Sequence, residues 1–203
     1  AIASGFATAA VLILGISAWY IRRDREVEVF KPSFQIASFA GVIAAFVLLM
    51  TGHEQGQEMR MYQPMKLAAI EAIWETEQPA SFSLLTIGDL TGKREVWSIR
   101  LPYLMSFLAC NNFECEVRGV NDLQAEYEEL YGPDDYIPLM VATYWSFRIM
   151  VGMGLLMLLV VIVGWVMHFK GRLYESPLFL RLAHWSMPVG FIAQAVACAL
   201  FRF

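Results

Sequence analysis

The sequence is short of charge. Only 17% of its 203 residues are Asp, Glu, Lys or Arg, against roughly 25% in ordinary soluble domains. With a net charge of −4 it also lacks the basic face that nucleic-acid binding requires. Three cysteines are too few for a disulfide framework, and no phosphate loop, nucleophile elbow or zinc spacing occurs. Apolar residues make up 58% of the chain, which indicates a membrane protein with a sizeable polar portion.

The apolar residues gather in four runs, each close to the roughly 20 residues that cross a bilayer. These runs are Ile2–Tyr20, Phe34–Met50, Leu139–Met167 and about Phe179–Phe201. The second run is the shortest, and the fourth is the most polar because it contains Arg181 and His184. The sequence therefore predicts an all-α membrane protein with four transmembrane helices and a large loop between the second and the third.

Basic residues in the two short links set the expected orientation, because short basic loops stay in the cytoplasm. These residues are Arg22, Arg23, Arg25 and Lys31 in the first link, and Lys170, Arg172 and Arg181 in the third. The long middle segment, which is strongly acidic, is then extracytoplasmic. We expect two helices in residues 1–50, the extracytoplasmic loop in residues 51–138 and two helices in residues 139–203.

The polar loop shows local signals of its own. Thr51–Arg60 is polar and rich in turn formers, and Pro64 suits the first position of a helix. Met65–Glu77 contains no helix breaker and carries an apolar stripe at spacings of three and four, so it is predicted to be helical. Pro79 and later glycines and prolines indicate loop with short strands, and Asn121–Tyr131 is predicted to be a second, acidic helix.

Several side chains allow more than one interpretation. Cys110 and Cys115 could form a disulfide on an oxidising face, or could pack as two independent small hydrophobic residues. His53 suits an exposed surface position. His184, inside the fourth run, could ligate a haem or a metal, or could hydrogen-bond a neighbouring helix.

Two residues of the third run have both a structural and a functional interpretation. Met150 could be plain packing, as most methionines in apolar helices are, or a haem ligand. Arg148 is costly inside a membrane unless it meets an acidic partner or an anion, although near the end of the helix it could extend to the head groups. Lys66 and Glu71 of the loop could be solvated charges or could bind one polar ligand together.

Several stretches resemble subunit I of cytochrome bd ubiquinol oxidase. The longest runs from Gly52-His-Glu-Gln-Gly-Gln-Glu-Met to Gln63-Pro-Met-Lys-Leu-Ala-Ala-Ile-Glu-Ala-Ile-Trp-Glu-Thr76, and its second part opens the quinol-binding loop of that family. Three shorter pieces match in the same order: Ala3-Ser-Gly-Phe6, Leu14-Gly-Ile-Ser-Ala-Trp-Tyr20 and Phe147-Arg-Ile-Met-Val151. The resemblance covers nearly the whole chain to about Ala193.

The resemblance implies functions for particular residues. Gln63, Lys66 and Glu71 fall on positions of the quinol site, where Glu71 would accept a proton and Lys66 would hold the other ring oxygen. Met150 falls on an axial ligand of the low-spin haem b, and Arg148 on the arginine beside that haem. The enzyme would oxidise quinol at the outer face and pass electrons through haem b to oxygen reduction at haem d.

The resemblance also implies partners and a location. The location is the lipid bilayer of the bacterial inner membrane. The partners are a second large oxidase subunit and possible small single-helix subunits. The four spans match the fifth to eighth helices of the family, whose first four helices carry the sites of the high-spin haem b and haem d. The histidine that is the second axial ligand would precede Ala1. We therefore expect a cut or truncated chain that is inactive alone, with divergence after Ala193.

Composition and topology also suit a different class of protein. A non-enzymatic four-helix sensor or scaffold, with an acidic extracytoplasmic interaction domain, would have the same apolar runs and basic links. It leaves Arg148 and the long block from Gln63 to Thr76 unexplained. The sequence does not distinguish ubiquinol from menaquinol as the reductant.

Overall fold

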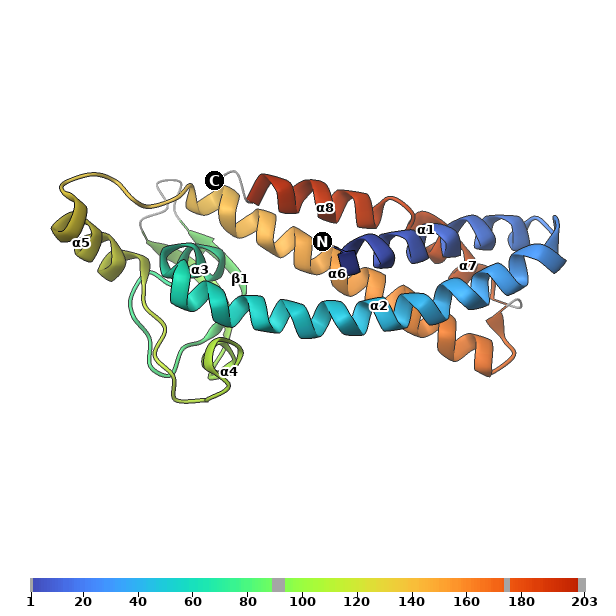
Figure 1. Cartoon of the computed structure of the whole chain (residues 1–203), viewed down its shortest axis with the longest axis horizontal. Coiled ribbons are helices and arrows are strands. Elements are labelled where there is room, and N and C mark those ends of the chain that lie inside the picture. Colours follow the sequence, from blue (N-terminus) through green and yellow to red (C-terminus); the bar gives the residue numbers. More distant parts are fainter. Residues whose placement is uncertain (1, 89–93, 174–175, 201–203) are drawn as a thin grey trace. The chain divides into compact units, whose positions relative to one another are not determined.

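The computed structural model describes residues 2–88, 94–173 and 176–200, and these are mostly helical (Figure 1). The chain divides into two compact units. The first, called the helical unit here, comprises Ala1–Met50 and Arg148–Cys198. The second, called the loop unit, consists mainly of Thr51–Phe147. The division falls within two long helices, α2 (Val27–Tyr62) and α6 (Met140–Phe169).

Among the described residues, four helical segments are long and apolar enough to cross a membrane. They are α1 (Ile2–Arg22), α2, α6 and the segment Pro177–Ala199. Each corresponds to one of the four predicted runs, which confirms the predicted fold class. Many of their large apolar side chains are exposed, as expected of helices whose outer surface faces lipid.

The core of the helical unit is built on one face of α1. Ala7, Val11, Leu14 and Ala18 recur at spacings of three and four and are all buried. They share one hydrophobic cluster with residues of the other helices of this unit, among them Phe34, Val160 and Phe179. The small residues on α1 allow close helix packing, which is typical of membrane bundles.

A glycine permits the close approach of α1 to α7 (Pro177–Trp185). A Cβ built on Gly15 would lie 2.9 Å from the carbonyl oxygen of Ala183 and would overlap the side chain of Met187. Any larger residue at position 15 would therefore force the two helices apart. Ser176 begins α7 by accepting a hydrogen bond from the amide of Phe179 at 3.4 Å.

The fourth predicted run is not one continuous helix. It consists of α7 and α8 (Val189–Leu200), separated by a turn at residues 186–188. Pro188 has no amide hydrogen to continue the hydrogen-bond ladder, which accounts for the break. The predicted fourth run is therefore present as the candidate span Pro177–Ala199, with an interruption at residues 186–188. Its last residue, Phe201, lies outside the described part of the chain.

Helix α2 is longer than the predicted run Phe34–Met50. The polar segment Thr51–Arg60, expected to form turns, continues the helix to Tyr62. Extending an existing helix is easier than starting one, and Glu, Gln, Met and Arg are good helix formers. Their combined preference outweighs the cost of Gly52 and Gly56, which is about 1 kcal/mol each.

The loop unit contains two short helices, a hairpin and a longer helix. They are α3 (Pro64–Glu71), the antiparallel strands β1 (Phe82–Gly88) and β2 (Glu95–Leu101), α4 (Leu104–Cys110) and α5 (Val120–Tyr131). The strands and α5 confirm the predictions for these segments. Helix α4 was not predicted from the sequence.

Helix α3 starts at Pro64 as predicted but ends six residues before the predicted end at Glu77. Ala72 adopts the left-handed conformation, with φ of 51°, and stops the helix. The following residues bond to the start of α5: the carbonyl of Ile73 accepts from the amide of Val120 at 2.9 Å. Tertiary hydrogen bonds therefore replace the helical ones that the sequence pattern favoured.

Candidate functional site

The three loop residues singled out by the sequence lie on or beside α3. Gln63 occupies the position before the helix and is exposed, and Lys66 in its first turn is half-buried. Glu71, the last residue of the helix, is only 2% exposed. A carboxyl group this well removed from water is rare unless other polar groups compensate it, and Glu71 does interact with neighbouring groups.

The turn that follows Glu71 is held by an arginine from β2. One Nη of Arg100 donates to the carbonyl oxygen of Ala72 at 2.6 Å and to the carboxylate of Glu95 at 2.8 Å. The other Nη lies 3.7 Å from the carboxylate of Glu77. Arg100 is not among the residues predicted from the sequence to be functional. The sequence signal that could have identified it is the two-residue alternation of a strand, which places Ser98 and Arg100 on one face of β2.

A buried network of hydroxyl groups joins β1 to the first turns of α6. The hydroxyl of Tyr144 accepts a hydrogen bond from the amide of Thr86 at 2.7 Å and lies 2.9 Å from Ser83 Oγ. Ser83 Oγ in turn lies 2.7 Å from Thr86 Oγ1. All three residues are buried, so the hydrogen bonds satisfy polar groups that water cannot reach.

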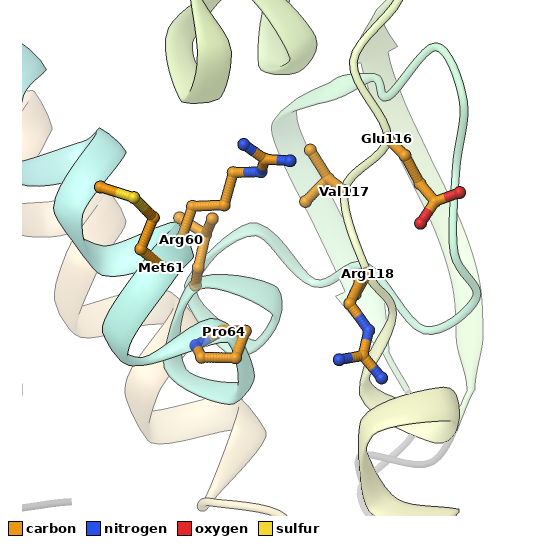
Figure 2. A pocket seen from close by; sticks show the side chains of 7 residues that line it. Arg60, Met61, Pro64, Glu116, Val117 and Arg118 are labelled. Carbon is orange, nitrogen blue, oxygen red and sulfur yellow. The ribbon is translucent and has the colours of Figure 1, made fainter. Parts of the chain in front are cut away.

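A cavity of about 250 Å³ opens beside α3, on the side that carries Pro64 and Leu67 (Figure 2). Arg60, Val117 and Arg118 also line it, while Gln63, Lys66 and Glu71 do not. Arg118 is paired with Glu126, and hydrogen bonding to that carboxylate raises the pKa of the Arg118 guanidinium above its ordinary value. The cavity is therefore a separate feature from the residues that the sequence marked.

Cys110 and Cys115 form a disulfide, with Cα atoms 6.2 Å apart. This decides between the two interpretations left open by the sequence. The bridge closes the short turn after α4. Near the bridge, Nε2 of His53 lies 2.8 Å from Asn111 Oδ1 and 3.0 Å from Gln57 Nε2. His53 is also half-buried, so it is not the freely exposed surface residue that was expected.

Met150 and Arg148 lie on α6, in the helical unit, and both side chains are half-buried. Two residues along a helix correspond to a rotation of about 200°, so the two side chains point in different directions. Gly154 follows Met150 by about one turn, and a Cβ built there would meet no atom within 4 Å. Open space therefore lies beside Gly154, about one turn along α6 from Met150.

That space belongs to an apolar groove of about 200 Å³. Its walls include Gly154 and Leu158 of α6, Ala7 of α1 and Gly41 of α2. A thioether is a known ligand of haem iron, and cofactor sites are lined mostly by apolar residues. Met150 is not among the residues that line this groove, but Val151 and Gly154 of the same helix are, so a flat apolar group in the groove would lie one turn or less from the thioether along α6.

The other chemical candidates do not form a centre. Within the described residues, no group of three or more His, Cys, Asp or Glu is placed to hold a metal ion. His184 is half-buried on α7, and its Nδ1 is buried without a hydrogen-bond partner among the described residues. Neither interpretation of His184, as a ligand or as a helix-to-helix hydrogen bond, gains support from its surroundings.

Comparisons with known proteins agree with one another. The model of the family described as cytochrome bd terminal oxidase subunit I matches residues 1–200, a range that extends past Ala193, where we expected the resemblance to end. The chain is 39% identical over 177 residues to "Cytochrome bd ubiquinol oxidase subunit 1" of Bacillus subtilis. It is also 30% identical over 247 residues to "Cytochrome bd-II ubiquinol oxidase subunit 1" of Escherichia coli.

These matches cover 87% and 94% of this chain but 38% and 48% of the two relatives, so the chain spans less than half of their length. Among solved structures, the bd oxidase from Geobacillus thermodenitrificans matches 98% of the chain and 44% of its own, with a TM-score of 0.86 at 24% identity. At that identity the structural match supports the fold, and the sequence matches support the family.

Proposed function

The chain belongs to the cytochrome bd terminal oxidase subunit I family, and from that premise we propose that it forms the quinol-oxidising part of a membrane-bound oxidase. In this proposal a quinol is oxidised beside α3, and the electrons go on to the reduction of molecular oxygen. The burial of Glu71 at the end of α3 carries the proposal, because it supplies a proton acceptor shielded from water.

Oxidation of a quinol to a quinone releases two electrons and two protons. A neutral quinol gives up electrons reluctantly, so a proton must leave as each electron does. A carboxylate within hydrogen-bond reach of a ring hydroxyl can take that proton. Glu71 is the proposed acceptor, and its position in a hydrogen-bonded turn limits competition from bulk water.

Lys66 and Gln63 are proposed to bind the same ring. An ammonium group stabilises negative charge that develops on a ring oxygen as its proton leaves. Lys66 lies five residues before Glu71 on α3, so the two side chains leave the helix in different directions and can approach different atoms of one ligand. Gln63, exposed before the helix, can donate to or accept from a ring substituent.

Met150 and Arg148 are proposed to hold the low-spin haem b. Met150 would supply a thioether ligand to its iron, and Arg148 would compensate its negative charge in the low-dielectric membrane. When bound, this haem supplies one-electron redox chemistry. The apolar groove lined by Gly154, about one turn after Met150 on the same helix, supports the assignment.

We further propose that the loop unit lies outside the bacterial inner membrane. The basic links Arg22–Lys31 and Lys170–Arg181 support this orientation. The disulfide Cys110–Cys115 supports it independently, because disulfides persist in oxidising compartments. The proposed partners are quinol, oxygen, a second large oxidase subunit and small single-helix subunits.

The test uses Lys66→Ala and Glu71→Gln in the assembled oxidase. Both variants should slow quinol-driven oxygen consumption, Glu71→Gln by about 10²-fold or more, because each removes a group that acts on the quinol. Haem content and oxygen consumption with an artificial donor that bypasses the quinol site should stay at the wild-type level. Glu129→Gln, which changes an exposed carboxyl group on α5, is the matched control. Equal slowing with both donors would contradict the proposal.

A further inference from the structure

Arg100 is a cation of the loop unit that contacts four other residues. Its side chain is 15% exposed and lies between the carboxylates of Glu95, at 2.8 Å, and Glu77, at 3.7 Å. It also reaches Ser81 Oγ, at 3.4 Å, and the carbonyl oxygen of Ala72, at 2.6 Å. Exposed ion pairs contribute little, but a shielded guanidinium with several acceptors fixes the groups around it.

The bond to Ala72 is the informative contact, because Ala72 directly follows Glu71. Ala72 has the left-handed conformation, which is unfavourable for a residue with a Cβ and persists only when its surroundings hold it. The amide of Ala72 donates to the carbonyl oxygen of Ala69 at 3.3 Å, and the amide of Ile73 donates to the carbonyl oxygen of Ala68 at 2.9 Å. On the carbonyl side Arg100 holds the turn.

Arg100 also fixes the chain further along. The carboxylate of Glu77 that faces Arg100 accepts hydrogen bonds from the amide and the hydroxyl of Ser81, at 2.9 and 2.7 Å. The backbone of Glu77 pairs with Val117 in both directions, at 3.1 and 3.0 Å. One guanidinium therefore ties the end of α3 to the segment that leads into β1.

We propose that Arg100 is a positioning residue for quinol oxidation, acting through the turn at Ala72 to hold the Glu71 carboxylate in its working orientation. The inference rests on the proposed function of Glu71. Arg100 need not touch the quinol. A helix end that moves by about 1 Å is enough to slow a proton transfer by about tenfold or more.

The test compares Arg100→Gln, Arg100→Lys and Glu71→Gln in the assembled oxidase. Arg100→Gln should lower kcat for quinol by about ten- to a hundredfold with little change in KM, while artificial-donor activity and haem content stay normal. Arg100→Lys, which keeps the charge and one donor to Ala72, should restore part of the loss. Arg118→Gln, which breaks a surface ion pair with Glu126 and leaves Ala72 untouched, should change kcat less than twofold.

The double variant Arg100→Gln/Glu71→Gln separates this inference from the proposed function. If Arg100 acts through Glu71, the double variant should be no slower than Glu71→Gln alone, because the effects of coupled residues do not add. A double variant whose loss of kcat is the product of the two single losses would overturn the inference. So would a wild-type kcat in Arg100→Gln, or equal slowing of Arg100→Gln with quinol and with the artificial donor. If Glu71→Gln itself oxidises quinol normally, the proposed function of Glu71 is wrong and the inference is wrong with it.

Discussion

Removing the hydroxyl of Tyr144 tests whether the buried network stabilises the loop unit. The change Tyr144→Phe keeps the ring, which is 4% exposed and packs in the cluster that contains Met65 and Trp74. It deletes the only atom of the side chain that can accept from the amide of Thr86. A buried N–H left without an acceptor costs about 1–3 kcal/mol.

Hydrogen exchange followed by mass spectrometry measures this cost where it arises. A loss of about 1–3 kcal/mol in the free energy of local opening corresponds to exchange about 5- to 150-fold faster. We expect that acceleration in peptides that cover β1, since Thr86 and Ser83 both lie on this strand. Peptides from α1 in the helical unit should exchange at the wild-type rate.

Tyr136→Phe is the matched control. Its hydroxyl donates to the carbonyl oxygen of Gly132 at 3.1 Å in a half-buried position, where water can replace the lost partner. We expect a change of less than about 0.5 kcal/mol for this variant. If Tyr144→Phe exchanged no faster than Tyr136→Phe, the reasoning that the Thr86 amide depends on Tyr144 would be refuted.

Two further predictions concern a sulfur ligand and a disulfide. In the assembled oxidase, Met150→Leu should change the absorption spectrum of the low-spin haem, because it removes the thioether. The control Met153→Leu should leave that spectrum unchanged. An unchanged spectrum in Met150→Leu would rule out ligation by Met150. Cys110 and Cys115 should resist alkylation until a reductant is added. Replacing both by Ala should lower the free energy of unfolding of the loop unit by about 2 kcal/mol, measured with denaturant, because the bridge closes a short turn. Alkylation without reductant would contradict the bridge.

The membrane spans could be predicted from the sequence because their signal is local. A run of apolar residues long enough to cross a bilayer has few alternatives, and the runs at α1 and α6 match their helices within a few residues. The ends of elements were less predictable. Residues 51–60 were polar enough to suggest turns, yet they continue α2, because a helix already formed extends through them at little cost.

The candidate site divides in the same way. Helix α3 and its polar side chains could be predicted from residues 63–71, because its signals, Pro64 and the apolar stripe, lie within the helix itself. The burial of Glu71 was not predictable, because it depends on the turn at Ala72 and on hydrogen bonds from segments far along the chain. Arg100 lies 28 residues from Ala72, so no local pattern connects them.

The sequence by itself determined the class of protein, its four spans and its family, because composition, apolar length and an uninterrupted motif need no knowledge of long-range contacts. Only the tertiary structure decided where α3 stops, which carboxyl group is withdrawn from water and which arginine bonds the turn that follows it. The physical reason is that burial and hydrogen bonding depend on what other segments bring to a residue. Those segments meet only when the chain has folded.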